Sequence, residues 1–161
     1  MNFREVRCPD VDDESTNDTH AYGLRIGSDF GAVDLSLAYT SVNDGDMWPM
    51  RLSDHNTQTP LFTATLYGDG DIATVPETDS YKITIGYDPF ESLRLTGAYG
   101  YYDHGMLLYS TMEDRSTAVE VSAQYTPSDH ISLYVAYMNS DFWWLDGDAL
   151  NSIRVWAKYQ F

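Results

Sequence analysis

Apolar and polar residues alternate along most of this 161-residue chain. A period of two is typical of β-strands with one apolar and one polar face, because successive side chains point to opposite sides of a strand. Seven segments follow this period: 21–30, 33–41, 80–87, 92–102, 117–125, 131–138 and 149–161. No helical period of 3.6 residues and no longer internal repeat interrupts them. The pattern therefore predicts an all-β, antiparallel fold of about seven strands.

The connections between the predicted strands alternate in length. The short turns are 29–32, 88–91 and 126–129, and the longer connections are 42–79, 103–116 and 139–151. A soluble β-sandwich has no reason to keep all its short turns at one end, whereas outer-membrane β-barrels combine short periplasmic turns with longer outer loops. We therefore predict a transmembrane β-barrel segment in which the apolar face of each strand meets lipid.

The last strand and the aromatic residues point to the same class of protein. Apolar residues occupy every second position up to the C-terminal phenylalanine: Ile153, Val155, Ala157, Tyr159 and Phe161. This arrangement resembles the insertion signal that the barrel-assembly machinery reads in bacterial outer-membrane proteins. Tyrosines and phenylalanines also gather at both ends of the apolar strand faces, as in the aromatic girdles of membrane barrels. We expect an integral protein of the bacterial outer membrane.

The first 20 residues differ from the rest of the chain. Residues 1–20 are polar and acidic, and we interpret them as the remnant of an outer loop that precedes a C-terminal barrel segment, 21–161. They contain no apolar core of a signal peptide, which an exported barrel needs. Bacterial single-chain barrels also have even numbers of strands, whereas seven is odd. We expect that the signal peptide and the first strands of the barrel are missing, and that residues 1–161 alone form no stable pore.

The charged residues divide unevenly between loops and strands. The chain has 25 acidic and 9 basic residues, a net charge of −16, which argues against nucleic acid as a partner. Five bases and one acid occupy the polar faces of the strands, and we predict that they line a pore: Arg25, Lys82, Arg94, Glu120, Arg154 and Lys158. Rows of basic side chains favour the passage of anions. A narrow barrel would instead pair these groups with one another.

Two stretches carry a resemblance to a known family. The loop residues PLFTATLYGDGDIATVPETDSY lead into the strand YKITIGYDPF, and the chain ends on NSIRVWAKYQF. Together they resemble the C-terminal part of OprD-type outer-membrane porins, which include the related major porins of epsilon-class bacteria. The resemblance implies an 18-stranded barrel with inward-folded loops and a basic ladder on its wall, which conducts small hydrophilic, anionic or carboxylate-bearing solutes. The resemblance also implies that the protein contacts outer-membrane lipid and lipopolysaccharide. It implies that the missing N-terminal strands pair with this segment, and it is compatible with assembly into a homotrimer.

No motif of an enzyme or cofactor site stands out. The four histidines show no metal-ligand spacing, and the single Cys8 cannot form an internal disulfide. The acidic segments 69–71 and 146–148, each Asp-Gly-Asp, could contribute oxygen ligands to calcium, although this sequence more often forms a turn. We expect no enzymatic activity and no cofactor.

Two other interpretations remain open from the sequence. One is a complete eight-stranded outer-membrane barrel with a structural or adhesive role, in which residues 61–67 form an extra strand rather than an inward-folded loop. The other is a soluble β-sandwich that binds carbohydrate through Trp48, Trp143 and Trp144. Expression in buffer without detergent would separate the sandwich from both kinds of barrel.

Overall fold

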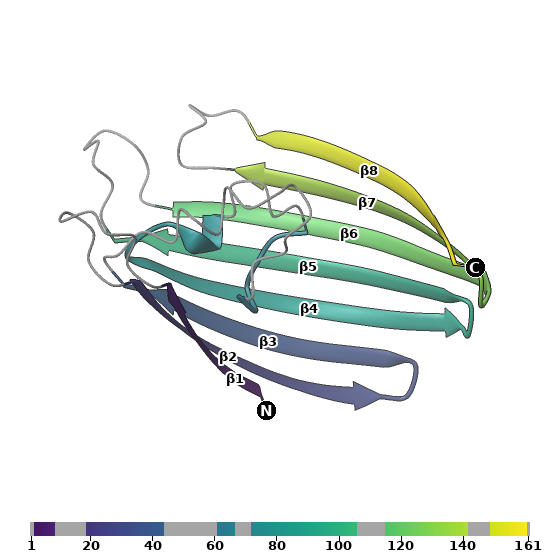
Figure 1. Cartoon of the computed structure of the whole chain (residues 1–161), viewed down its shortest axis with the longest axis horizontal. Coiled ribbons are helices and arrows are strands. Elements are labelled where there is room, and N and C mark those ends of the chain that lie inside the picture. Colours follow the sequence, from purple (N-terminus) through teal and green to yellow (C-terminus); the bar gives the residue numbers. More distant parts are fainter. Residues whose placement is uncertain are drawn as a thin grey trace.

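The computed structural model describes residues 2–8, 19–43, 61–66, 72–105, 115–141 and 149–160, with the backbone alone for 3–8 and 19. Within them the chain forms one antiparallel sheet in which each strand pairs with the next along the sequence (Figure 1). The strands are β1 (Asn2–Cys8), β2 (Thr19–Phe30), β3 (Val33–Val42), β4 (Thr78–Phe90), β5 (Leu93–His104), β6 (Arg115–Ser128), β7 (Ile131–Asp141) and β8 (Leu150–Tyr159). One turn of 3-10 helix, η1 (Ile72–Thr74), precedes β4. None of the described helical residues forms a helix long and apolar enough to span a membrane.

The short turns lie together at one end of the sheet. They join β2 to β3, β4 to β5 and β6 to β7, and Figure 1 shows all three at the end where β8 finishes. The register is regular along each pair except close to two of these turns, where it shifts between Tyr87 and Phe90 and between Tyr125 and Ser128. The predicted all-β, antiparallel fold with its turns on one side is therefore confirmed.

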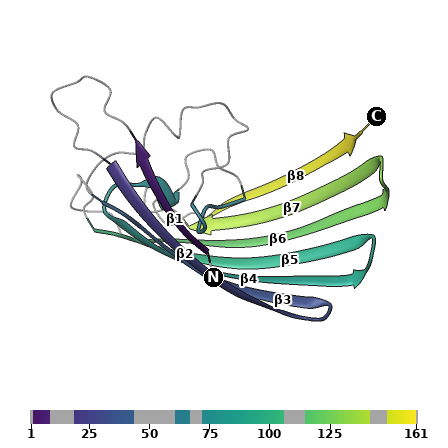
Figure 2. The ribbon, with the colours of Figure 1, turned by 60° about the horizontal axis from the view of Figure 1, so that its bottom comes forward.

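The sheet curves into an open trough rather than lying flat (Figure 2). β1 pairs with β2 alone and β8 with β7 alone, so the described part of the sheet does not close on itself. The curvature gives the sheet an inner, concave face and an outer, convex face. An open, curved, all-antiparallel sheet is what a segment of a β-barrel looks like.

The two faces differ in the way that the sequence pattern predicts. The outer face carries exposed apolar side chains, among them Ile26, Val121 and Val155, which are 54%, 53% and 75% exposed. The inner face carries small or polar side chains such as Thr40, Ser80 and Ser140, all of them buried. A sandwich in water would bury the apolar face instead, because that burial drives folding. The exposed apolar face of the described strands therefore favours a membrane barrel over the soluble β-sandwich.

The core of the molecule lies against the inner face. It combines side chains of the sheet with residues of the connection between β3 and β4, and its members are Ala21, Val42, Leu61, Ile72, Ala73, Tyr102, Ala118, Ala136 and Met138. The described part of that connection, Leu61–Leu66 together with η1, thus folds inward. Residues Leu61–Leu66 form a turn and irregular backbone and belong to none of the strands, so the extra strand required by the eight-stranded alternative is absent from them.

Two expectations about strands need correction. Asn2–Cys8, interpreted as part of an outer loop, forms β1 and pairs with β2 from Asn2 opposite Arg25 to Cys8 opposite Thr19. The segment NFREVRC lacks a clean apolar face, and backbone pairing with β2 decides its structure. Six of the seven predicted strands also extend a few residues further than their apolar pattern, because hydrogen bonding continues where polar side chains begin.

The inner face of the sheet as candidate functional site

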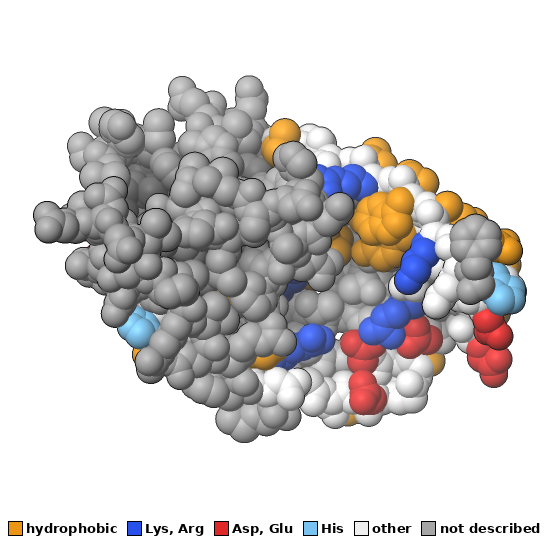
Figure 3. Space-filling model, in the orientation of Figure 1, with side chains coloured by type: hydrophobic (Ala, Val, Ile, Leu, Met, Phe, Trp, Pro, Cys, Tyr) orange, Lys and Arg blue, Asp and Glu red, His pale blue; other side chains and the backbone are white. Residues whose placement is uncertain are grey.

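All six residues predicted to line a pore lie on the inner face. Register places Arg25 beside Ala38 and Ala38 beside Lys82, which forms one row across β2, β3 and β4. On β8, Arg154 lies opposite the buried Ala136, and Lys158 lies opposite Ser132. Glu120 on β6 and Arg94 on β5 contact inner-face partners described below. Figure 3 shows Lys and Arg side chains in the hollow of this face, with Asp and Glu beside them toward the short-turn end.

Lys82 and Glu120 attach the inward-folded segment Leu61–Leu66 to the sheet. The Lys82 ammonium donates to Glu120 Oε2 at 2.7 Å and to the Ala64 carbonyl at 2.5 Å. The other oxygen of Glu120 accepts from the backbone amide of Leu66 at 2.9 Å. Both side chains are nearly buried, 10% and 4% exposed. The segment therefore has two of its backbone polar groups satisfied by one ion pair, which offsets the cost of removing them from water.

Two further contacts hold the same segment. The Tyr102 hydroxyl donates to the Thr63 carbonyl at 2.8 Å, and the Thr63 hydroxyl donates to Thr40 Oγ1 at 2.9 Å. The Tyr102 ring reaches the segment by lying over Gly100, where an added Cβ would come within 2.8 Å of two ring carbons. Close to this layer, at the loop end of β5, the buried His104 hydrogen-bonds with Thr78 at 2.8 Å and with Ser116 at 3.0 Å. The loop-side half of the inner face is thus filled by protein.

Arg94 is paired with two acids at the short-turn end. It donates to Asp34 Oδ2 at 2.6 Å and to Asp88 Oδ2 at 2.7 Å, which links β3, β4 and β5. Gly86 lies beneath this bridge, and a Cβ there would collide with both Asp34 and Arg94. Asp34 and Asp88 lie at or next to the short turns 29–32 and 88–91 predicted from the sequence, and neither was among the predicted site residues. Their position on the polar side of the alternation, opposite the apolar set, was the signal that could have placed them on the inner face.

The charge of the inner face is divided between two regions. Toward β2–β6 lie the described acids Asp29, Asp34, Asp88 and Glu120, together with Arg25, Lys82 and Arg94. Toward β7 and β8 lie Arg154 and Lys158, and the described residues on the inner face of these two strands include no acid. Arg25 itself donates to Ser36 Oγ at 3.2 Å. Among the described inner-face residues, the bases on β2–β6 are therefore accompanied by acids, whereas β7 and β8 form a positive region with no described acid.

An aromatic pair lies inside the positive region. Tyr134 of β7 and Trp156 of β8 are opposite each other in the register, with ring centroids 4.2 Å apart and ring planes tilted by 31°. The same row continues through Gln124 to Arg94. Neither ring was among the predicted site residues. The available signal was a tryptophan on the otherwise polar side of the final strand.

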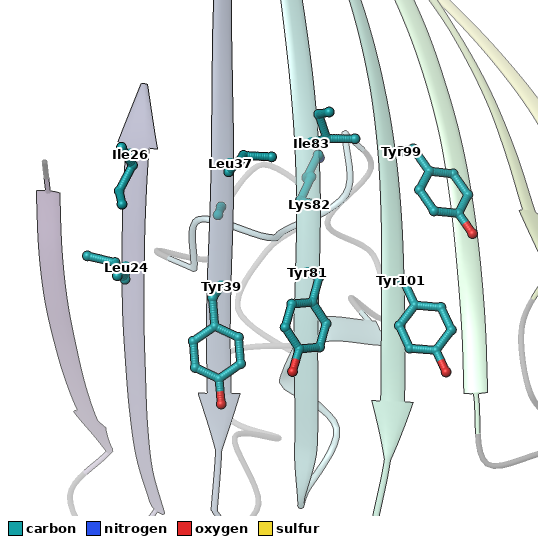
Figure 4. A pocket seen from close by; sticks show the side chains of 10 residues that line it. Leu24, Ile26, Leu37, Tyr39, Tyr81, Lys82, Ile83, Tyr99 and Tyr101 are labelled. Atoms are coloured by element: carbon teal, nitrogen blue, oxygen red, sulfur yellow. The ribbon is translucent and has the colours of Figure 1, made fainter. Parts of the chain in front are cut away.

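The outer face carries the predicted insertion signal. Ile153, Val155 and Tyr159 are 70%, 75% and 59% exposed, and Ala157 shares their side of β8; Phe161 lies outside the described residues. Figure 4 shows an apolar groove on this face, lined by Leu24, Leu37 and Ile83, with the hydroxyls of Tyr39, Tyr81 and Tyr101 all directed toward the loop end. The Tyr39 hydroxyl donates to Asp79 at 2.8 Å. The outer face thus becomes polar at its loop-side rim.

The other candidate sites named from the sequence fall on undescribed residues. This applies to Trp48, Trp143 and Trp144, and to both Asp-Gly-Asp segments, 69–71 and 146–148. Among the residues whose side chains the structure describes, no three His, Cys, Asp or Glu residues lie close enough together to hold a metal ion.

A family model described as "Gram-negative porin" matches residues 6–142, which is most of the chain. No curated protein matches it.

Proposed function

Because the chain belongs to the Gram-negative porin family, we propose that the inner face of its sheet lines an outer-membrane channel for passive diffusion of small hydrophilic solutes. The observation that carries this proposal is the inverted distribution of side chains: the polar face is inside and the apolar face is exposed. Lipid is the solvent that makes such an outer face favourable, while a hydrated lumen suits the inner face. The protein supplies a path and performs no chemical step.

The inward-folded segment Leu61–Leu66 narrows this channel. Its support is the set of contacts with Lys82, Glu120 and Tyr102, which hold irregular backbone against the wall rather than above it. Irregular backbone at membrane depth is tolerated where it is covered by protein or lines a water-filled cavity. The half of the wall nearer the short turns, with Arg94, Trp156 and Lys158, stays open.

Solute preference follows from the charge on the open half. Arg94 is neutralised by two acids, and Lys82 by Glu120. The described inner faces of β7 and β8 carry Arg154 and Lys158 and no acid, and we assign to the channel a preference for anionic, carboxylate-bearing solutes. This preference, the inward-folded segment and the basic residues of the wall agree with an OprD-type porin of 18 strands. That finer assignment, with lipopolysaccharide, the barrel-assembly machinery and a homotrimer as partners, is part of the proposal.

Reversal potentials test the preference directly. The assembled porin that contains this chain is reconstituted in a planar bilayer under a KCl gradient, with Arg154→Gln/Lys158→Gln compared against the unaltered protein. We expect the double variant to shift toward cation preference, most strongly at low salt, where charges are screened least. Val155→Ile, on the outer face of the same strand, is the matched control and should leave the potential unchanged. A folded protein without conductance would refute the channel, and an unshifted potential would refute the anion preference alone.

A further inference from the structure

An apolar groove crosses the outer face of the sheet from β2 to β5 (Figure 4). Leu24, Leu37 and Ile83 lie along it, and its volume is about 370 Å³, which is within the range of pockets that bind small ligands. Because this face meets lipid in the proposed barrel, an acyl chain is the apolar group available to fill the groove. A hollow in an apolar face can hold one lipid in a fixed position, which a smooth face cannot.

Three tyrosine hydroxyls border the groove on the side of the long loops. Register places Tyr39, Tyr81 and Tyr101 in one row across β3, β4 and β5, and Figure 4 shows their hydroxyls directed the same way. The Tyr39 hydroxyl donates to Asp79. The hydroxyls of Tyr81 and Tyr101 make no hydrogen bond with another described residue. Each of these two is therefore a donor available to an oxygen of a lipid headgroup.

Two carboxylates lie one step further toward the loops. Asp79 and Asp103 are directly opposite each other on β4 and β5, on the same face as the tyrosines. Like charges in this position destabilise a sheet, so a cation that meets both carboxylates removes a repulsion. Arg115 of β6 lies opposite Asp103, and Asp141 of β7 belongs to the tyrosine row. The described rim of β4–β7 thus holds three acids and one base.

The groove, the hydroxyls and the carboxylates follow one another in the order of the parts of a phospholipid. An acyl chain suits the groove, phosphate oxygens suit the hydroxyl donors, and a headgroup cation suits the carboxylates. Asp79 precedes Tyr81, and Asp103 follows Tyr101, by two residues. Two residues of strand span about 7 Å, so a single headgroup can meet both layers.

We propose that this groove binds one phospholipid whose headgroup ends in a primary ammonium, as in an ethanolamine phospholipid. Its acyl chain lies against Leu37 and Ile83. Its phosphate accepts from the two tyrosine hydroxyls, and its ammonium donates to Asp79 and Asp103. Charge selects this occupant, because a lipid of net negative charge, lipopolysaccharide included, would bring its anions to a predominantly acidic rim. The site rests on the proposed position of the outer face in lipid and on no property of the solute.

Lipid retention by the assembled porin that contains this chain tests the selectivity. The detergent-solubilised protein is titrated with three phospholipids that share the same acyl chains, and bound lipid is counted by native mass spectrometry. The headgroups are ethanolamine, choline, whose cation has no N–H, and glycerol, which leaves a net negative lipid. We expect the ethanolamine lipid to bind about tenfold more tightly than the choline lipid, as for one hydrogen bond to a charged group, and the glycerol lipid to bind most weakly. Equal retention of all three would overturn the site.

Variants at the rim assign the headgroup contacts. In Asp79→Asn/Asp103→Asn the preference for ethanolamine over choline should disappear, because the acceptors of the ammonium have lost their charge. Tyr81→Phe/Tyr101→Phe should weaken the binding of both lipids alike, since both carry the phosphate. A preference for ethanolamine that survives without the two carboxylates would contradict the proposed contacts.

A larger side chain tests the groove itself. Ile83→Trp should fill it and lower the retention of all three lipids. Val121→Trp, on the same face of β6 and outside the groove, is the matched control and should bind lipid like the unaltered protein. Should thermal unfolding show that either Trp variant has lost its fold, Ile83→Phe and Val121→Phe give the same comparison with a smaller ring. Equal retention by the two variants would overturn the groove as the binding site.

Competition and conductance separate this proposal from its alternatives. Purified lipopolysaccharide that displaces the ethanolamine lipid at equal concentration would overturn the choice of occupant. Conductance of the same preparations is recorded in a planar bilayer. A conducting porin without lipid preference refutes the site and leaves the channel standing, whereas a folded porin that selects the ethanolamine lipid and never conducts refutes the channel alone.

Discussion

Lys82 stabilises the fold, a role that its position in a basic ladder does not suggest. Its ammonium is 2.7 Å from Glu120 and is almost completely buried. In Lys82→Met the Glu120 carboxylate would still accept a hydrogen bond from the Leu66 amide, but it would lose the positive charge that compensates it. Removing one member of a buried pair costs about 3–5 kcal/mol, because the other charge stays buried without compensation. We expect a clear fall in the unfolding temperature of the detergent-solubilised porin.

The double variant Lys82→Met/Glu120→Met gives the control for this prediction. It removes both charges and leaves no isolated ion, so most of the lost stability should return. Arg94→Met, which removes a solvent-exposed pairing, should have a much smaller effect. A double variant as unstable as Lys82→Met would mean that the methylene chain of Lys82, rather than the ion pair, holds the site together.

Single residues also mark the limit of what sequence could predict. The period of two placed Arg25, Arg154 and Lys158 on the inner face correctly, because facing follows directly from strand parity. The partners of Arg94 could not be read in this way. Asp34 lies 60 positions away in the chain, and its contact depends on the register of three strands and on the space above Gly86. Pairing is a property of the assembled sheet.

At the scale of elements, the inward-folded segment Leu61–Leu66 offers a direct test. Replacing these six residues by Gly and Ser at equal length would remove Leu61 and its buried contacts with the core, and the hydroxyl of Thr63. Chain entropy would then favour release from the wall. We expect a larger single-channel conductance and a weaker dependence of conductance on solute size.

The matching control leaves the segment intact and alters the turn Gly31–Ala32, which lies at the other end of the sheet. Ala32→Ser should leave conductance unchanged. Equal conductance in the replaced and unaltered proteins would show that Leu61–Leu66 does not narrow the path.

The sequence of this segment left strand and loop equally open, for a physical reason. LFTATL alternates like a strand, yet its Thr63 and Ala64 carbonyls and its Leu66 amide bond to side chains of the sheet. A strand would give these groups to a neighbouring backbone. Side chains of the sheet bond to these backbone groups in place of a neighbouring strand. The local alternation of residues contains no information about which of these two partners the backbone groups take. β1 is the opposite case, in which pairing with β2 produces a strand without a clean pattern.

At the scale of the whole molecule, the residues that fold against the inner face bear on how wide the closed barrel must be. The interior of an eight-stranded barrel is just wide enough to be filled by side chains, whereas barrels of 16–18 strands leave an aqueous channel. Here the inner face of the open sheet holds a backbone segment and η1, and Trp156 and Lys158 are exposed. We therefore expect a barrel wider than one closed by the pairing of β1 with β8. The number of strands in that barrel stays a prediction.

Cross-linking tests whether β1 and β8 are neighbours. Cys8, the only cysteine, lies at the loop end of β1, and Asn151 and Ser152 lie at the loop end of β8 on opposite faces. In lipid an unpaired strand edge is not viable, so each edge must pair with further strands if the eight do not close. We expect Asn151→Cys and Ser152→Cys to form no disulfide with Cys8 within one chain. The control is Ser140→Cys/Leu150→Cys with Cys8→Ser, whose paired positions on β7 and β8 should cross-link in the same assembled protein. An internal Cys8 disulfide in a monomer that shows the heat-modifiable band of a folded barrel would contradict the wide barrel.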